Sequence, residues 1–219
     1  MELDGFLALA EWRRTVAAIY ARWRESATDP AAAWERWRLA RDDLFRNHAQ
    51  SPLPVDERAR FGGLSYFSYD PAYRMQARVV PANEPAAPLA LASGGLVELP
   101  SSGQESFAFR RIGQVHLSGP LAGSVLPVFW MEGYAGGIFL PFRDATSGIE
   151  TYAAGRYLLD TVKGADQGAD PEQRDLVLDF NLAYHPSCAY DSKWNCPLAP
   201  PQSRLSVPVR VGERLGTSG

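Results

Sequence analysis

The chain has 219 residues, 46% of them hydrophobic and 21% charged, as expected for a folded protein of one or two domains. Its formal net charge of -3 at pH 7 leaves no surplus of cations to neutralise phosphate groups, which argues against nucleic acid as a partner. The longest uncharged stretch, residues 117–131, is too short to cross a bilayer, and Glu2 and Asp4 stand where an export signal carries basic residues. We therefore expect a cytoplasmic protein that does not bind membranes.

Residues 1–49 show the periodicity of two helices. Apolar side chains recur at steps of three and four and form one stripe on the first helix: Leu9, Trp12, Val16, Ile19 and Trp23. Asp29 followed by Pro30 favours a second helix start, because the carboxylate can cap the first turn and proline needs no N–H there. The second stripe mixes aromatic residues with arginine: Trp34, Trp37, Arg41, Leu44, Phe45 and His48. We interpret the pair as packed on a sheet, with arginine stems covering tryptophan rings; the alternative is a partner-binding surface.

The rest of the chain shows β-strands joined by short turns. Over residues 73–80, apolar Tyr73, Met75, Ala77 and Val79 alternate with polar residues, as in a sheet with one face in water. Further strands are expected over 64–70, 105–117, 125–132, 136–142, 149–160, 175–183 and 206–211. This series predicts a mainly β (α+β) fold, an antiparallel β-barrel or curved sandwich with an N-terminal helical pair.

The chain is expected to have three parts. The helical pair, residues 1–49, packs on the main domain, residues 50–214 form the antiparallel β domain, and residues 215–219 form a flexible tail. The sequence contains no glycine-rich dinucleotide motif, no P-loop, no Gly-x-Ser-x-Gly elbow and no standard zinc motif. We therefore expect no cofactor and no metal site.

Three stretches resemble a family of bacterial and archaeal proteins, domain-of-unknown-function family 1684. "SPLPVDERARFGGLSYF" (51–67) is close to its Ser-Pro-Leu…Phe-x-Gly-Leu-x-Tyr-Phe signature. "LPFRDATSGIETYAAGRYLLD" (140–160) is close to Pro-Phe-x-Asp-x-Thr-x-Gly-x-Glu-Thr-Tyr…Gly-Arg-Tyr-Leu. Residues 178–214 are similar to Asp-Phe-Asn-x-Ala-Tyr-Asn-Pro-x-Cys-Ala-Tyr, followed by Cys-Pro-x-x-Pro-Pro and Gly-Glu.

The resemblance runs from about residue 36 to 214 and implies membership of the family, which carries no known activity. Two residues depart from the family pattern: His185 replaces an asparagine, and Ser203 stands near another one. A function common to the family should therefore not require a histidine at position 185.

The segment 141–160 is unusually rich in charged residues for a strand. Asp144 belongs to a turn that its own polar groups can explain, since Asp and Thr side chains accept hydrogen bonds from nearby backbone N–H groups. Glu150 and Tyr152 are two residues apart and would share one face of a strand. If that face lines a barrel, the carboxylate has a raised pKa and can act as general acid or base. Alternatively, both face water, or Glu150 pairs with Arg156.

The strand "LDFNLAY" places Asp179 and Asn181 on one face. A carboxylate and an amide inside a sheet must be hydrogen-bonded, because an unpaired buried polar group is costly. They either tie down the loop that follows or converge with Glu150 on a ligand.

Cys188 and Cys196 lie in an irregular segment that is rich in aromatic residues and proline. They are either buried packing residues, a nucleophilic thiol activated by His185 or Lys193, or a metal site with His185 that lacks a fourth ligand. A disulfide is disfavoured in the cytoplasm.

These observations favour a small-molecule-binding protein. It could be an acid–base enzyme of a biosynthetic pathway, such as a hydrolase, isomerase or cyclase. In that case the expected catalytic residues are Glu150, Tyr152 and Asp179. The expected ligand-binding residues are Asp144, Asn181, Arg156, Tyr184, Tyr190 and Trp130. The partner would be a small, moderately apolar organic molecule held in a pocket of roughly several hundred Å³. The rival is a non-catalytic interaction protein, in which the tryptophan-rich helices present an exposed aromatic patch to a partner or to a second copy of the chain.

Overall fold

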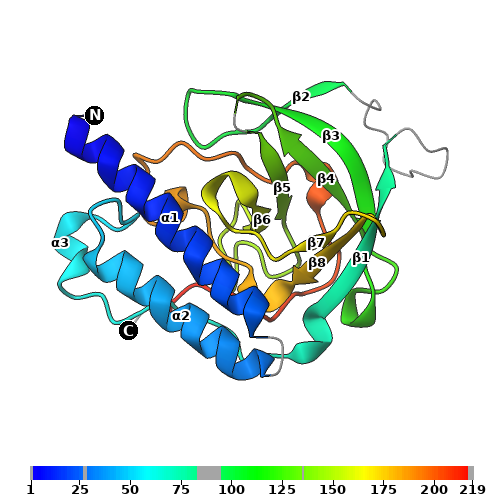
Figure 1. Ribbon diagram of the computed structural model, residues 1–219, viewed down its shortest axis with the longest axis horizontal. Helices are drawn as coiled ribbons and strands as arrows, with labels where there is room; N and C mark the ends of the chain where they lie inside the picture. The colour runs from blue at the N-terminus through cyan, green and yellow to red at the C-terminus, as the bar shows by residue number, and fades with distance from the viewer. Residues whose placement is uncertain (1, 27–28, 83–94, 135, 217–219) are drawn as a thin grey trace.

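A computed structural model describes residues 2–26, 29–82, 95–134 and 136–216 of the protein. It contains a pair of long helices and an eight-stranded antiparallel sheet that curls into a half-barrel (Figure 1). The predicted fold class, mainly β with an N-terminal helical pair, is therefore confirmed.

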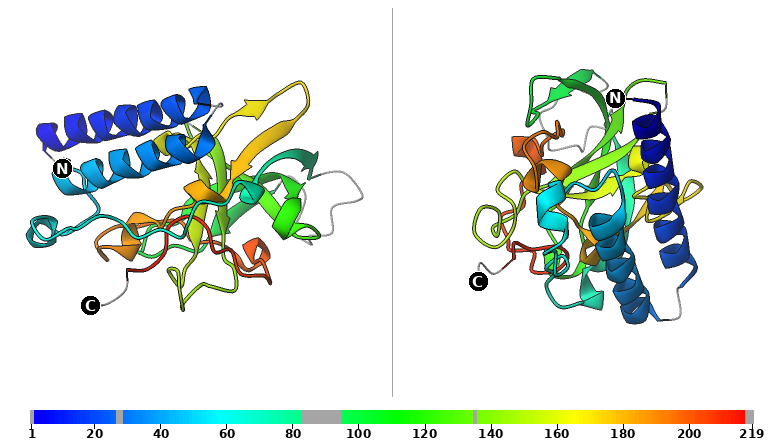
Figure 2. Two further views of the ribbon diagram at one scale, coloured as in Figure 1. Left: turned by 90° about the horizontal axis from the view of Figure 1, so that it is seen from below. Right: turned by 90° about the vertical axis from the view of Figure 1, so that its left-hand side faces the viewer.

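The helical pair consists of α1 (Leu3–Glu25) and α2 (Pro30–Asn47), which lie side by side along one side of the molecule (Figure 2). The Asp29 carboxylate accepts a hydrogen bond from the Ala32 N–H at 3.0 Å, so the second helix starts with the expected side-chain cap. A short third helix, α3 (Val55–Arg58), follows.

The tryptophans of the helical pair face inward. Trp23, Trp34 and Trp37 are buried and pack with Ala165 and Leu182 of the β domain. The guanidinium groups of two arginines on α2, Arg38 and Arg41, lie 4.9 Å from the ring centroids of Trp34 and Trp37, respectively. These three tryptophans therefore contribute to the core, and the exposed aromatic patch expected of an interaction protein cannot be built from them.

The sheet has the order β6-β5-β4-β3-β1-β8-β7, with β2 paired to β3. Its strands are β1 (Arg74–Pro81), β2 (Leu96–Leu99), β3 (Phe107–His116), β4 (Val125–Met131), β5 (Gly137–Phe142), β6 (Arg156–Asp160), β7 (Ala169–Asp170) and β8 (Asp175–Asp179). Every pairing between these strands is antiparallel. Apolar side chains of β1, β3, β4, β5, β6 and β8 form the largest core cluster.

Curvature of the sheet has a local cause in β3. The pairing of β3 with β4 shifts between Arg111 and Gly113, which marks a β-bulge. A Cβ atom on Gly113 would lie 2.5 Å from the Val80 carbonyl oxygen, so only glycine allows β1 to approach β3 this closely.

Four expected strands are wrong in whole or in part. The strand expected over 175–183 ends at Asp179, because residues Phe180–Leu182 form a 3-10 turn, so Asp179 and Asn181 do not share a strand face. The segment 149–160 forms a strand only from Arg156, because the Thr146 carbonyl accepts the N–H groups of residues 149, 150 and 151 and folds them into a tight turn. Gly155, with φ +100°, then separates this turn from β6. Residues 206–211 form no strand, and 64–70 contribute only an isolated bridge between Tyr66 and Glu213.

Two further observations concern the ends and the surface of the chain. Leu215, the first residue of the expected flexible tail 215–219, donates its N–H to the Glu150 carbonyl at 2.8 Å, while residues 217–219 lie outside the described residues. Among the helices of the described segments, none has the length and apolar character needed to span a bilayer.

Candidate functional site

Asp144 lies at the base of the turn between β5 and β6, and its buried carboxylate is saturated. It accepts the Thr146 hydroxyl at 2.8 and 3.0 Å, the Ser147 hydroxyl at 3.2 Å and the Val209 N–H at 2.5 Å. It also forms an ion pair with Arg156 at 3.4 Å. These partners occupy both carboxylate oxygens and leave Asp144 without a free face for a ligand.

Arg156, the first residue of β6, is a fully buried cation that holds the C-terminal segment. Its guanidinium donates to the carbonyls of Val209 at 2.8 Å, Val211 at 2.6 Å and Glu213 at 3.1 Å. Burial lowers the pKa of Arg156 to about 10, and Asp144 partly opposes this shift. Arg156 thus binds every second residue from 209 to 213, and so holds this irregular segment against the edge of the sheet.

Glu150 and Tyr152 lie in different surroundings, since the strand that would have placed them on one face is a turn. The Glu150 carboxylate forms a surface ion pair with Arg210, whose Nη2 is 2.9 Å away, and this hydrogen-bonded arginine lowers the Glu150 pKa. The Tyr152 hydroxyl donates to Cys188 Sγ at 3.8 Å, and burial raises the Tyr152 pKa to about 12. A carboxylate that is ionised and solvated in this way has no raised pKa with which to act as a general base.

Asp179 and Asn181 are fully buried and bonded to each other and to the chain before β1. Asp179 Oδ1 accepts the backbone N–H and the side-chain amide of Asn181 at 2.9 and 2.8 Å. The same amide exchanges hydrogen bonds with the backbone of Asp70, accepting its N–H at 2.9 Å and donating to its carbonyl at 2.8 Å. This geometry ties residue 70 to the end of β8 and does not bring the pair to Glu150.

A second buried ionic group joins α2 to the C-terminal segment. Glu213 Oε2 accepts from Arg41 Nη2 at 2.9 Å and from the His185 backbone N–H at 3.2 Å, while Oε1 accepts the Tyr190 hydroxyl. Burial raises the pKa of Glu213 to about 7, although the Arg41 charge acts in the opposite direction. Glu213 is therefore the point at which the helical pair, the segment 184–190 and the C-terminal segment meet.

His185 cannot act as a general base in this arrangement. Its Nε2 accepts the Tyr152 backbone N–H at 3.2 Å, so its lone pair is in use. Its Nδ1 faces Glu213 Oε1 at 3.5 Å, which places the proton on Nδ1. Burial, together with the charges of Arg156 and Arg41, lowers the His185 pKa to about 3, and the ring stays neutral.

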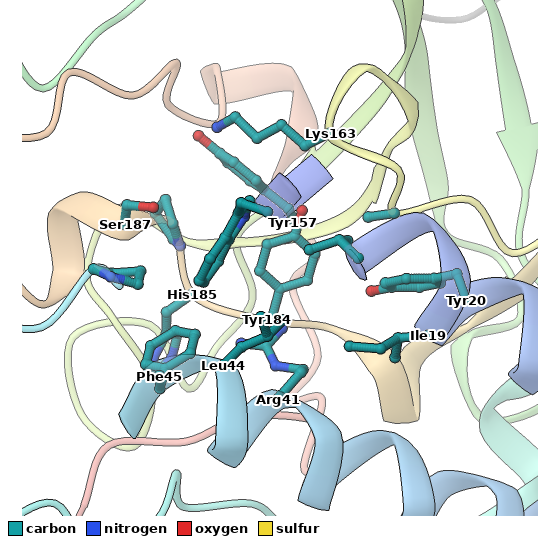
Figure 3. Close-up of a pocket in the computed structure, with 15 residues that line it drawn as sticks. Ile19, Tyr20, Arg41, Leu44, Phe45, Tyr157, Lys163, Tyr184, His185 and Ser187 are labelled. Atoms are coloured by element: carbon teal, nitrogen blue, oxygen red, sulfur yellow. The ribbon is translucent and has the colours of Figure 1, made fainter. Parts of the chain in front are cut away.

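A cavity of about 70 Å³ lies between the helical pair and the β domain. Tyr20 of α1, Arg41 of α2 and Tyr184 point toward it from three sides (Figure 3). Apolar walls come from α1 and α2, and Tyr157, Lys163 and His185 complete the lining. Larger hollows of about 290, 310 and 300 Å³ lie elsewhere on the surface, and their lining contains none of the predicted site residues.

The model of a family described as "Protein of unknown function (DUF1684)" matches residues 59–214, more than half of the chain. The chain belongs to the DUF1684 family. It is also similar to an uncharacterised protein of Haloarcula marismortui whose solution structure was solved by NMR. The two sequences are 31% identical, the alignment covers 89% of this chain and 99% of that one, and the TM-score is 0.59. No curated protein matches the chain.

Position 185 has a simple structural role in this DUF1684 chain. His185 Nε2 accepts the Tyr152 N–H, and the side-chain oxygen of a glutamine, which extends about as far from the backbone, could accept the same bond. The residue therefore serves to hold the loop.

Of the six expected ligand-binding residues of this DUF1684 protein, only Tyr184 lines the cavity between the helical pair and the β domain. Tyr190 is bonded to Glu213, and Trp130 on β4 is 39% exposed. The structure brings together Asp144 with Arg156, and Asp179 with Asn181, but not the two pairs with Glu150.

Sequence reasoning missed Tyr20, Arg41 and Glu213 as site residues. Arg41 interrupts an apolar helical stripe, which is a signal of a buried cation, and its guanidinium covers the Trp37 ring as expected. Glu213 follows Gly212 in an irregular segment and carries no local signal of burial. Tyr20 follows Ile19 next to the stripe of α1 and carries no signal that distinguishes it from core packing.

Proposed function

We propose that this protein binds a small organic acid, or a similar molecule with an oxygen acceptor, in the cavity between the helical pair and the β domain. The observation that carries the proposal is that two buried residues lining this cavity, Tyr20 and Arg41, each keep a polar atom that no group in the described part of the chain hydrogen-bonds. Buried donors are normally paired, so a small rotation of either side chain toward the cavity would let an acceptor there complete them.

The unmatched atoms of Tyr20 and Arg41 are both donors. The Trp37 indole N–H lies beside the Tyr20 oxygen but forms no hydrogen bond of standard geometry with it, and an indole can only donate. The phenol hydrogen of Tyr20 therefore needs an acceptor. The same holds for Arg41 Nε, since Glu213 is bonded to a different guanidinium nitrogen of that residue, Nη2.

The side chains that line the cavity favour a ligand with an acceptor, such as a carboxylate. Arg41 and Lys163 are cations, and no acidic side chain is present among the lining residues that the structure describes. Burial raises the pKa of both Tyr20 and Tyr184, so both phenols stay protonated and able to donate. Lys163 is paired with Asp160, 3.7 Å away, and Arg41 with Glu213, 2.9 Å away, so an anion would be held by the remaining donors of the lining and not by an unpaired cation.

The size of the cavity limits the ligand. A volume of about 70 Å³ corresponds to roughly five water molecules, since each needs roughly 10–15 Å³. This is smaller than the pocket expected from the sequence and suits a molecule with a few heavy atoms. The apolar side chains Val16, Ile19 and Leu44 would contact its carbon atoms.

Catalysis by Glu150, Tyr152 and Asp179 receives no support from the geometry, because the three groups have separate environments. Glu150 is bonded to Arg210 at the surface, Tyr152 to Cys188, and Asp179 to Asn181 in the interior. The proposal is therefore binding, without a reaction assigned to these residues.

Replacing Tyr20 by phenylalanine should weaken binding of short carboxylic acids by about tenfold, because the variant lacks one hydrogen bond to a charged group. Propionate and butyrate are the probes, titrated into the isotopically labelled protein and followed by the NMR shifts of the residues that line the cavity. The wild type is expected to bind with a Kd of roughly 1 mM, which is consistent with the small number of ligand atoms.

Tyr66→Phe is the matched control. The Tyr66 hydroxyl is also buried and without a partner among the described residues, but Tyr66 does not line the cavity. Its removal should leave the Kd unchanged. Equal affinities for the wild type and Tyr20→Phe, or no binding by the wild type, would contradict the proposal. If the wild type binds these acids and Tyr20→Phe binds them more weakly, native mass spectrometry of protein purified from its source organism should identify the acid that it retains.

A further inference from the structure

The segment after His185 brings two free cysteines together next to a phenol. Cys188 lies in the 3-10 turn Ser187–Ala189 and is partly exposed, whereas Cys196 is buried eight residues later. The Cys196 thiol hydrogen-bonds the sulfur of Cys188. Two sulfur atoms in hydrogen-bond contact need only a small movement to form a bond, and most of the residues between them have no regular structure.

A donor contacts the Cys188 sulfur. The Tyr152 hydroxyl donates to it at 3.8 Å, whereas the Ser102 hydroxyl, which lies nearby, donates to the Trp194 carbonyl at 3.0 Å. Ser102 also accepts the Cys196 N–H at 2.9 Å, and its own N–H donates to the Cys196 carbonyl at 3.0 Å, which fixes the second cysteine. Donors that point at one sulfur stabilise its thiolate, and a thiolate is the reactive form of cysteine.

The two thiols therefore differ in character. The hydrogen bonds from Cys196 and Tyr152 lower the Cys188 pKa to about 6, against the effect of burial. The interaction with Cys188, followed by burial, raises the Cys196 pKa. One accessible thiolate and one buried thiol correspond to the attacking and resolving partners of disulfide exchange.

We propose that Cys188 and Cys196 form a thiol–disulfide exchange site whose substrate is the disulfide of a low-molecular-weight thiol. The Cys188 thiolate attacks one sulfur of the substrate, which forms a mixed disulfide and releases the first thiolate. Cys196 gives its proton to a released thiolate and attacks Cys188 Sγ, which forms the Cys188–Cys196 disulfide and releases the second. The substrate disulfide is reduced to two thiols, and the two cysteines are oxidised by two electrons.

This site is independent of the acid-binding cavity. Neither cysteine lines that cavity, and Tyr20 and Arg41 take no part in the exchange. His185 takes no part either, because its Nε2 is bonded to the backbone of Tyr152. A third metal ligand near the two cysteines is not found in the described residues, so the geometry favours thiol chemistry over a metal site.

The experiment uses the full chain, reduced and then exposed to oxidised glutathione as the probe. After acid quenching, the remaining thiols are alkylated and the protein mass is measured. In the wild type, neither cysteine should be alkylated, and the protein mass should fall by two hydrogen atoms with no glutathione attached. Cys196→Ser should stop at one glutathione on Cys188, and Cys188→Ser should acquire none over the same time.

The pH dependence of the alkylation rate distinguishes a thiol with a lowered pKa from a thiol that is merely exposed. Relative to the same cysteine in the urea-unfolded chain, Cys188 should be alkylated about twentyfold faster at pH 5.5 but only about twofold faster at pH 7, because a lower pKa raises the thiolate fraction and reduces its nucleophilicity. Tyr152→Phe should move the inflection of this profile upward. Circular dichroism confirms that each variant is folded, and Cys196→Ala replaces Cys196→Ser if it is not.

Two results would overturn the proposal: a folded Cys196 variant that acquires no glutathione on Cys188, or a wild type that keeps glutathione on both cysteines. Either result leaves the acid-binding cavity untouched, because that proposal is tested with Tyr20→Phe and not with the cysteines.

Discussion

Arg156→Met is expected to lower the free energy of unfolding by about 3–5 kcal/mol, because it leaves the Asp144 carboxylate buried without its cation. Both side chains of this ion pair are at most 1% exposed. The variant also removes the donors to the carbonyls of Val209, Val211 and Glu213. Urea unfolding followed by circular dichroism measures the loss.

Arg210→Met is the matched control for this substitution. Arg210 also pairs with a carboxylate, Glu150, but its side chain is 61% exposed, and such a pair contributes roughly 0–1 kcal/mol. Adding Asp144→Asn to Arg156→Met should recover part of the loss, because it removes the unpaired charge. Similar small losses in Arg156→Met and Arg210→Met would show that the buried pair does not fasten the C-terminal segment.

The second large effect concerns acid stability. His185 has its pKa lowered to about 3, from an ordinary value near 6.5 in the unfolded chain. Between these values the unfolded histidine binds a proton that the folded one does not, so the stability that neutral His185 contributes is present above pH 6.5 and is lost as the pH falls toward 3. From pH 7.5 to 4.5 this loss amounts to roughly 2–3 kcal/mol.

His185→Gln isolates this effect, since the glutamine side chain reaches about as far as Nε2, can still accept the Tyr152 N–H and does not titrate. Glu213, whose pKa is raised to about 7, acts with the opposite sign, because a carboxylic acid that stays protonated when folded loses stability as the pH rises. Glu213 is present in both proteins, so the difference between their stabilities should change by the His185 amount. Parallel curves of unfolding free energy against pH would contradict the expectation.

The helical pair could be predicted from the sequence because its signals are local. The apolar steps of three and four, and the Asp29-Pro30 start, depend only on neighbouring residues. The alternation in β1 is equally local, and Met75 and Ala77 are buried as expected, while Gln76 and Arg78 are exposed. The resemblance to the DUF1684 family is also carried by short stretches of sequence, and the match of the family model to residues 59–214 confirms the predicted membership.

The candidate site was less predictable, for two physical reasons. The shared face of Glu150 and Tyr152 depended on a strand, and the turn at Thr146 replaced it. Arg41 and Glu213 are 172 residues apart, and nothing in local periodicity tells which buried cation meets which carboxylate. Asp179 and Asn181 were recognised as a pair, but their actual partner, Asp70, lies more than a hundred residues away and left no pattern of its own.

The bond between Arg41 and Glu213 also has a consequence for the order in which the protein is assembled in the cell. Synthesis proceeds from the N-terminus, so α2 leaves the ribosome long before its carboxylate partner exists. Until residue 213 emerges, Arg41 and the tryptophans around it have no completed interior to enter, and closing so long a loop is entropically slow. The helices should therefore remain loosely attached on the nascent chain and dock only after residue 213 has emerged, which makes this interval the one most exposed to chaperones and proteases.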